Sequence, residues 1–271
     1  MKCISFNINS LRIRLHQIEA IIEKYQPDII GIQETKVADE QFPVDDIEAL
    51  GYHVAFHGQK THYGVAIMSK HPITQVIKGF ETDTDDSQKR FIGIKIAPNT
   101  GEEITILNGY FPQGDNQDHE KKFPAKRAFY QDLQQHLKQH HSPNDSLIVM
   151  GDMNVAPDLE AIGLPEAERL RWLKKGKCSF LEQEQSWLQT LLDWGLIDTF
   201  SLARKAEEPH LSWFDYRTRG FERDPKQGLR IDFILATKPL AGHCTQAGID
   251  HDIRAMEKPS DHCPVFAQFE L

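Results

Sequence analysis

Carboxylate, amide and imidazole side chains recur in this sequence where apolar, strand-like runs come to an end. Glu34 continues the face formed by Ile30 and Ile32, and Asp152 and Asn154 follow the apolar residues of another run in the same alternation. The residues at or next to such ends are Asn7, Glu34, Asn108, Tyr110, Asp152 and Asn154, while Asp261 and His262 directly precede the last strand-like run. Oxygen ligands accompanied by histidine but by no thiolate suit a hard cation such as Mg²⁺ or Mn²⁺ better than zinc. The pattern therefore predicts phosphoryl chemistry, in which a carboxylate or imidazole handles the proton of water and polar groups donate hydrogen bonds to the oxyanion.

Each of these residues also has a structural explanation when it is taken alone. Gly151–Asn154 could be a turn, Asn7 could be a hydrogen-bonded amide of the core, and Glu34 could cap a helix. The Asp261–His262 pair could be structural in the same way. Asp232 lies among apolar neighbours and needs a partner to offset its desolvation. Because all these residues occur together, the sequence favours a shared site.

Apolar periodicity predicts the elements that position these side chains. The predicted strands are Met1–Asn7, Asp28–Ile32, Tyr52–Phe56, Val65–Ser69, Phe91–Ala97, Ile104–Tyr110, Leu147–Met150, Ile231–Ala236 and Val265–Phe269. The predicted helices are Leu11–Tyr25 after a Ser10 cap, Asp118–Gln139, Glu166–Lys174 and Glu182–Trp194. Short connections, such as Pro98–Gly101, leave no room for a crossover helix, so much of the sheet should be antiparallel. We expect layered α/β architecture, with two packed sheets, helices outside, and residues 1–271 forming a single domain.

The composition is typical of a soluble globular protein, with 39% hydrophobic and 26% charged residues. The start of the chain does not resemble a signal peptide, and no apolar run approaches the roughly 20 residues that span a membrane. We therefore expect a cytoplasmic protein without membrane association. The net charge of −9 argues against a protein that coats nucleic acid, but it leaves room for local basic patches. The scattered cysteines predict buried, reduced thiols; they are Cys3, Cys178, Cys244 and Cys263.

Seven short motifs occur in order along the whole chain. They are Ser5–Asn9, Gln33–Lys36, Asn108–Pro112, Gly151–Asn154, Ser212–Arg217, Leu229–Asp232 and Ser260–Val265. Together they resemble the motifs of the exonuclease III-like abasic-site repair nucleases. The resemblance implies a four-layer α/β sandwich of the endonuclease/exonuclease/phosphatase superfamily, with two packed mixed, largely antiparallel β-sheets flanked by helices.

The resemblance also implies residue roles. The metal ligands would be Asn7, Glu34, Asp152, Asn154, Asp261 and His262, with Mg²⁺ as the ion and Mn²⁺ as its substitute. The catalytic residues would be Tyr110, Asp152, Asn154, Asp232 and His262. Tyr110 would contact the scissile phosphate, and Asp232 would orient His262. Asn9 stands where some relatives carry Asp, and the number of metal ions stays open at one or two.

The implied substrate is double-stranded DNA with abasic sites, nicks or 3′ ends, and the enzyme is expected to be a monomer. Trp213 and Phe214 would pack against the abasic deoxyribose, while Arg90 and Gln113 would contact the DNA. A basic stretch is either a further backbone contact or a solvated helix face; it comprises Arg169, Arg171, Lys174, Lys175 and Lys177. The balance of exonuclease and abasic endonuclease activity stays open, as does the identity of the general base.

Two other functions compete with this one. The same site parts occur in relatives that cleave inositol phosphates or sphingomyelin, and a silent module could bind nucleic acid or protein through the same scaffold. The Ser212–Arg217 segment argues against the first alternative, and the presence of every expected site residue argues against the second.

Overall fold

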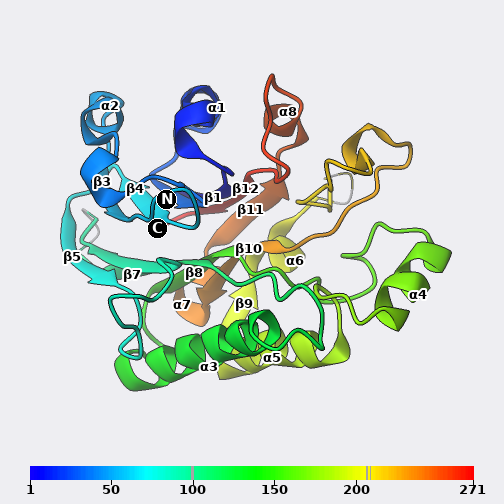
Figure 1. The fold of residues 1–271 in the computed structure, drawn as a ribbon. Helices are drawn as coiled ribbons and strands as arrows, with labels where there is room; N and C mark the ends of the chain where they lie inside the picture. The colour runs from blue at the N-terminus through cyan, green and yellow to red at the C-terminus, as the bar shows by residue number, and fades with distance from the viewer. Residues whose placement is uncertain (99–100, 206, 208) are drawn as a thin grey trace.

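Two six-stranded sheets lie face to face in the centre of the molecule (Figure 1). The computed structural model describes residues 1–98, 101–205, 207 and 209–271. The first sheet contains, in order across it, β11 (Cys244–Ile249), β12 (Val265–Phe269), β1 (Lys2–Asn7), β2 (Ile29–Gln33), β4 (Val65–Ser69) and β3 (His53–His57). The second contains β5 (Ile73–Lys78), β6 (Phe91–Ile96), β7 (Ile104–Tyr110), β8 (Leu147–Asp152), β10 (Asp232–Thr237) and β9 (Leu196–Asp198). β1 pairs with β2 and β7 pairs with β8 in parallel, whereas the other pairs of these strands are antiparallel.

Helices cover the outer side of each sheet (Figure 1). The first sheet is covered by α1 (Leu11–Tyr25), α2 (Val44–Ala49) and α8 (His251–Arg254), and the second by α3 (Lys122–His140) and α5 (Glu182–Trp194). α4 (Glu166–Lys174) lies at one end of the molecule. The short helices α6 (Thr199–Ala203) and α7 (Lys238–Ala241) lie beside β9 and β10. The predicted four-layer α/β sandwich is thus confirmed.

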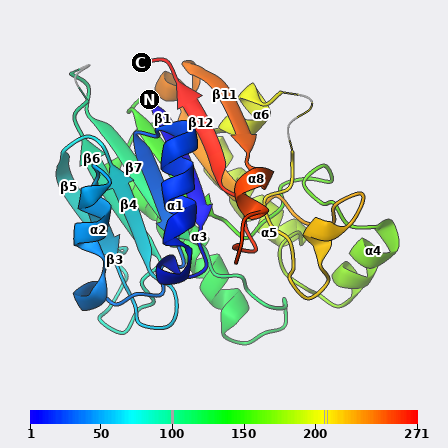
Figure 2. The same ribbon diagram turned by 90° about the horizontal axis from the view of Figure 1, so that it is seen from above.

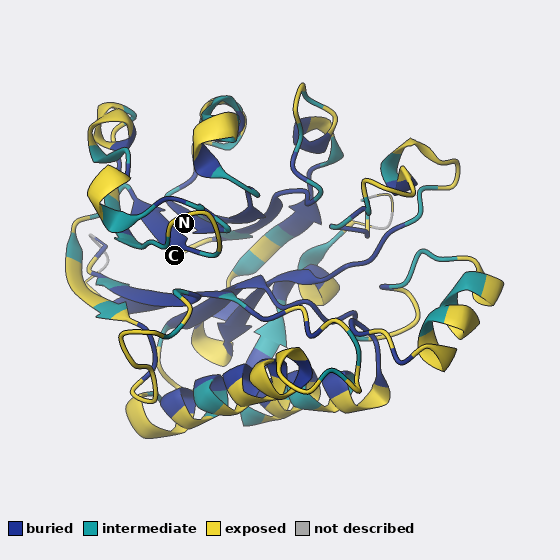
Figure 3. Ribbon diagram, in the orientation of Figure 1, coloured by how far each residue is buried: buried dark blue, intermediate teal, exposed yellow. Residues whose placement is uncertain are grey.

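Three apolar layers hold the sheets and helices together. The middle layer lies between the sheets and includes Ile67, Ile106 and Ile148, while separate outer layers join each sheet to its helices. Figure 3 shows the central strands buried and the outward helix faces exposed. Each fully buried Ile or Leu contributes about 1.5–3 kcal/mol through the hydrophobic effect. Because Asp152 shares its strand face with Ile148, its side chain points into the space between the sheets.

The predicted strands are present, and their ends either match the prediction or differ from it by at most two residues. Asn99 and Thr100 of the predicted Pro98–Gly101 connection lie outside the described residues, but β6 and β7 on either side pair in the expected antiparallel way. The patterns missed β5, β9 and β11. β5 is a largely exposed edge strand, β9 has three residues, and β11 begins with polar residues, so none shows a clear apolar run.

Two details of the predicted helices were wrong. Ser10 makes no side-chain hydrogen bond to α1, and its φ of 95° is outside the usual cap conformation. α3 begins at Lys122 instead of Asp118, because Asn116 Oδ1 and His119 Nδ1 accept backbone N–H groups and form a turn first. α4 and α5 have the predicted bounds.

The chain ends meet on the first sheet, where the Met1 carbonyl accepts a hydrogen bond from the Phe269 N–H at 2.7 Å (Figure 2). The cysteines are free thiols; three are buried as predicted, but Cys244 is partly exposed. Among the described residues, no helix combines the length and apolar character needed to cross a membrane.

Candidate active site and metal centre

The predicted polar residues gather around a cavity of about 450 Å³ at one edge of the two sheets. β1, β2, β7 and β8 all end there, because each parallel pair runs towards the same edge. The predicted residues that line the cavity are Glu34, Tyr110, Gln113, Asp152, Asn154, Trp213, Asp261 and His262. Asn7 and Asp232 lie just beneath it, buried and bonded to lining residues. The structure thus brings together the predicted metal and catalytic residues.

Strand register aligns three site residues across the second sheet. Tyr110 is the partner of Asp152 in the parallel β7–β8 pair, and Asp152 is the partner of Asp232 in the antiparallel β8–β10 pair. Side chains of directly paired residues lie on the same face of a sheet. The register therefore aims all three side chains at the first sheet.

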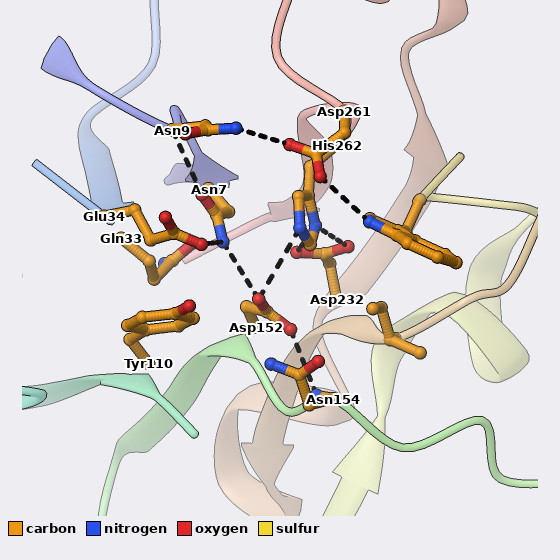
Figure 4. A network of polar contacts seen from close by, with 12 residues as sticks. Asn7, Asn9, Gln33, Glu34, Tyr110, Asp152, Asn154, Asp232, Asp261 and His262 are labelled. Carbon is orange, nitrogen blue, oxygen red and sulfur yellow. Dashed lines mark hydrogen bonds and ion pairs between the residues drawn. The ribbon is translucent and has the colours of Figure 1, made fainter. Parts of the chain in front are cut away.

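Asn7 connects the carboxylates of the two sheets (Figure 4). Its Nδ2 donates to Glu34 Oε1 at 3.0 Å and to Asp152 Oδ2 at 2.9 Å. The Asn7 carbonyl in turn accepts from the Ser260 hydroxyl at 2.7 Å. One buried amide thus positions a carboxylate from each sheet.

His262 lies between two buried carboxylates. Its Nδ1 donates to Asp232 Oδ2 at 2.9 Å, and its Nε2 lies 3.6 Å from Asp152 Oδ2 (Figure 4). Ser212 Oγ donates to the same Asp232 oxygen at 2.6 Å, which fixes the carboxylate that orients the imidazole.

The pKa values of His262 and Asp152 are both raised above their ordinary values. Burial alone would lower the pKa of His262, but Asp232 and Asp152 outweigh it and raise the pKa to about 10. Burial, assisted by the Asp232 charge and opposed by His262, raises the pKa of Asp152 to about 7. The charged imidazolium is therefore the favoured form at neutral pH.

A second chain of hydrogen bonds runs along the rim. Lys36 Nζ lies 2.9 Å from Glu34 Oε2 and donates to Asn9 Oδ1 at 2.6 Å. Asn9 Nδ2 donates to Asp261 Oδ1 at 2.9 Å, and Trp213 Nε1 donates to Asp261 Oδ2 at 3.1 Å. These bonds connect the Glu34 side of the cavity to its aromatic wall.

The carboxylate oxygens on the Glu34 side of the cavity suit a hard divalent cation as ligands. Burial would raise the pKa of Glu34, but the Lys36 ammonium and the hydrogen bond from Asn7 outweigh it and hold the pKa below its usual value. Glu34 is therefore an ionised oxygen donor, and an ammonium already lies against it. Asp152 and Asp261 line the same cavity, and such a carboxylate set is typical of Mg²⁺ sites.

Within the described residues, Asp152, Asp232 and His262 form another group that could hold a metal ion. One ligand atom from each lies within 4.8 Å of the others. The oxygens of Asp232 already accept hydrogen bonds from Ser212 and His262. Asp232 is thus engaged as an orienting group, so the Glu34 side of the cavity has the carboxylates that are freer to hold a cation.

The predicted DNA-contact residues divide into two groups. Gln113 and Trp213 line the cavity. Phe214 is fully buried in the core against Phe221, at 5.1 Å between ring centroids, and the structure does not bring it to the cavity. Arg90 is also buried, with its guanidinium 4.5 Å from the ring centre of Tyr110, so in this structure it supports that tyrosine. DNA contacts by Phe214 and Arg90 stay predictions.

Sequence reasoning assigned no role to four residues that build the site. Lys36 and Ser212 lie inside the recognised motifs and contact site carboxylates directly. Lys126 and Glu184 form a fully buried ion pair beneath the cavity. Lys126 could have been found in the sequence, because it shares the apolar face of α3 with Phe123, Tyr130 and Leu133. A charged residue is rare on such a buried face.

The Asn154 loop depends on this buried pair. Asn154 has a φ of 55°, its Nδ2 donates to the Phe111 carbonyl at 3.0 Å, and its carbonyl accepts from Lys126 Nζ at 2.8 Å. Glu184 Oε2 accepts from the N–H groups of Ser179 and Leu181. The pair therefore joins two loops that line the cavity.

Comparison with known proteins agrees with this geometry. The model of the Endonuclease/Exonuclease/phosphatase family matches residues 4–262. The chain is 54% identical over 270 residues to an exodeoxyribonuclease III of Haemophilus influenzae, with 100% of both chains covered. It is also similar to an AP endonuclease from Archaeoglobus fulgidus (TM-score 0.89, 35% identity) and to the 3′ phosphatase NExo from Neisseria bound to a product DNA hairpin (TM-score 0.88, 33% identity), with 100% of each chain covered. The chain belongs to the endonuclease/exonuclease/phosphatase family.

Proposed function

We propose that this protein hydrolyses phosphodiester bonds of double-stranded DNA, cutting 5′ to abasic sites and removing nucleotides and blocking groups from 3′ ends. Its standing as a DNA repair nuclease of exodeoxyribonuclease III type follows from 54% identity to such an enzyme over the full length of both chains. The observation that carries the proposal is the Asn7 amide. It joins Glu34 to Asp152 beside the His262–Asp232 pair, beneath a cavity large enough for part of a nucleotide.

The proposed reaction is in-line attack of water on phosphorus. The P–O3′ bond breaks, and the O3′ leaving group takes a proton from solvent, so that the products are a 3′-hydroxyl and a 5′-phosphate. Asp152 lies at the cavity floor and takes the proton of the attacking water. His262, held charged and oriented by Asp232, donates a hydrogen bond to a phosphoryl oxygen as negative charge develops there. The Tyr110 hydroxyl and the Asn154 side chain line the same cavity and bind the phosphate there.

The proposed cofactor is Mg²⁺, with Mn²⁺ as a substitute. Glu34 would be its main ligand, with Asn7, Asp152, Asn154 and Asp261 as the other candidates around the cavity. His262, also a predicted ligand, could join them only as a neutral imidazole, because the charged ring has no free lone pair. When bound, the ion supplies positive charge that offsets the charge on the phosphate. Trp213 presents an apolar face on which a deoxyribose without a base can pack.

Residues 1–271 would form one catalytic domain that acts as a cytoplasmic monomer on nicks, abasic sites and 3′ ends. One apolar layer contains residues of both sheets, which supports a single folding unit. Size-exclusion chromatography with light scattering would test the monomer.

The deciding experiment measures cleavage of a duplex with one abasic-site analogue, in Mg²⁺ and in EDTA. We expect wild type to cut only with the metal, and Asp152→Asn to lower kcat by about 10²–10⁴-fold. Asp46→Asn, an exposed carboxylate on α2, is the matched control and should leave kcat unchanged. Equal cleavage under all conditions would sink the proposal. Binding without cleavage would favour the silent module, and hydrolysis of phosphoinositides alone would favour the other substrate class.

A further inference from the structure

A second cavity, of about 190 Å³, adjoins the reaction cavity on its α4 side. The two share the side chains of Trp172, Lys177, Trp213 and Asp215. We propose that this second cavity binds a phosphate of the cleaved strand that flanks the scissile one, with Lys177 as its principal ligand. The inference rests on the proposed function, because it concerns the DNA bound at that site.

The lining of the second cavity carries positive charge, although the protein as a whole is acidic. Arg171, Lys175 and Lys177 line the cavity with exposed side chains, and none of them forms an ion pair within the described part of the chain. Two carboxylates, Glu168 and Asp215, also line it. Asp215 already accepts from the Arg217 backbone N–H at 2.9 Å and lies 3.7 Å from the Arg217 guanidinium. The unpaired charge is therefore positive, as an anion site requires.

The structure also holds Lys177 in place before DNA binds. Its Nζ lies 4.6 Å from the centre of the Trp172 ring, and the Trp172 indole N–H donates to the Cys178 carbonyl at 2.9 Å. The neighbouring Gly176 carbonyl accepts from the Gln117 N–H at 2.7 Å. Because the lysine and its backbone are constrained on both sides, little conformational entropy is lost when a phosphate binds.

Trp213 explains why the occupant is the same strand. One edge of its indole donates to Asp261 in the reaction cavity, and its side chain also forms part of the second cavity. A sugar packed on Trp213 is joined covalently to a phosphate on each side. With one phosphate at Asp152 and His262, the strand leads past Trp213 towards Lys177. The second cavity therefore binds the DNA backbone and makes no sequence-specific contact with bases.

The test combines a protein change with a DNA change. Binding of an abasic-analogue duplex is measured by fluorescence anisotropy across a salt series, for wild type, Lys177→Gln and Lys174→Gln. Lys174 is the last residue of α4, three positions before Lys177, and lines neither cavity, so its variant removes an equal charge outside the site. Duplexes with one neutral methylphosphonate at each flanking position are measured in parallel.

We expect Lys177→Gln to weaken binding about tenfold at low salt and to lower the slope of log Kd against log salt by about 0.9, the value for one phosphate contact. One methylphosphonate position should weaken wild type to the same extent and should have no further effect on Lys177→Gln. Lys174→Gln should bind as wild type does.

The inference is overturned if Lys177→Gln binds like Lys174→Gln, or if its loss adds to that of the methylphosphonate at every position. Cleavage by wild type in Mg²⁺ keeps the two proposals apart. If wild type cleaves DNA but the losses from Lys177→Gln and from each methylphosphonate simply add, only the phosphate site is refuted. If the two losses are coupled at one position but wild type does not cleave DNA, only the proposed reaction is refuted.

Discussion

The buried ion pair between Lys126 and Glu184 offers the sharpest test of how the cavity is held together. Both side chains are fully buried. The Lys126 ammonium contacts Glu184 Oε1 and donates to the carbonyls of Asn154 at 2.8 Å and Gln113 at 3.2 Å. Lys126→Met keeps most of the side-chain volume but removes the charge and the donors. Glu184 is then left as a buried carboxylate without a counter-charge.

Removing one partner of a buried ion pair costs about 3–5 kcal/mol of unfolding free energy. For a chain of this size, such a loss lowers Tm by roughly 6–20 °C. Lys122→Met is the matched control, because Lys122 lies on the same helix and pairs with Asp115 at 2.8 Å on the exposed surface. That change should cost less than about 1 kcal/mol.

Urea titration and calorimetry would measure these losses, together with the double variant Lys126→Met/Glu184→Gln. The neutral amide removes the uncompensated charge while its oxygen can still accept a backbone N–H. We therefore expect the double variant to be more stable than the sum of the single changes predicts, by at least about 1 kcal/mol. Strict additivity, or a Lys126→Met variant as stable as the control, would refute this account.

Three further predictions concern backbone, pH and metal. Gly151→Ala should lower the free energy of unfolding, measured by urea titration, by more than about 3 kcal/mol, because a Cβ there would lie 1.9 Å from the Gly109 carbonyl oxygen. The control Gly51→Ala has nothing within 4 Å of the added Cβ and should lose only about 1 kcal/mol, owing to its positive φ. Burial, with the neighbouring histidines, lowers the pKa of His136 to about 4, so the unfolded chain gains a proton that the native state does not. Stability should fall as pH drops from about 6.5 towards 4, by up to about 3 kcal/mol, and His136→Phe should flatten that loss in a series of melts. Mg²⁺ at 100 times its Kd should stabilise wild type by about 2.7 kcal/mol; an equal rise in Tm for Glu34→Gln would contradict our placement of the metal.

Local periodicity was enough to single out several of the polar side chains that line the cavity. Glu34 and Asp152 interrupt apolar alternation at strand ends, and alternation is a property of a single strand. The layered α/β class followed from the same patterns, whereas the finer architecture and the DNA substrate came from the order of the motifs. Weakly apolar edge strands such as β5 escaped prediction, because their residues face solvent and show no buried face.

Tertiary structure decided the relations among those side chains. The register of β8 against β10 sets Asp232 beside Asp152, although 80 residues separate them in the sequence. Only packing shows that Trp213 faces the cavity while Phe214 enters the core. The pairing of Lys126 with Glu184 is likewise invisible to a local pattern, since each residue obtains its partner from a different helix. A residue's face is set by its own backbone, but the stability of its charge depends on neighbours that only the complete fold supplies.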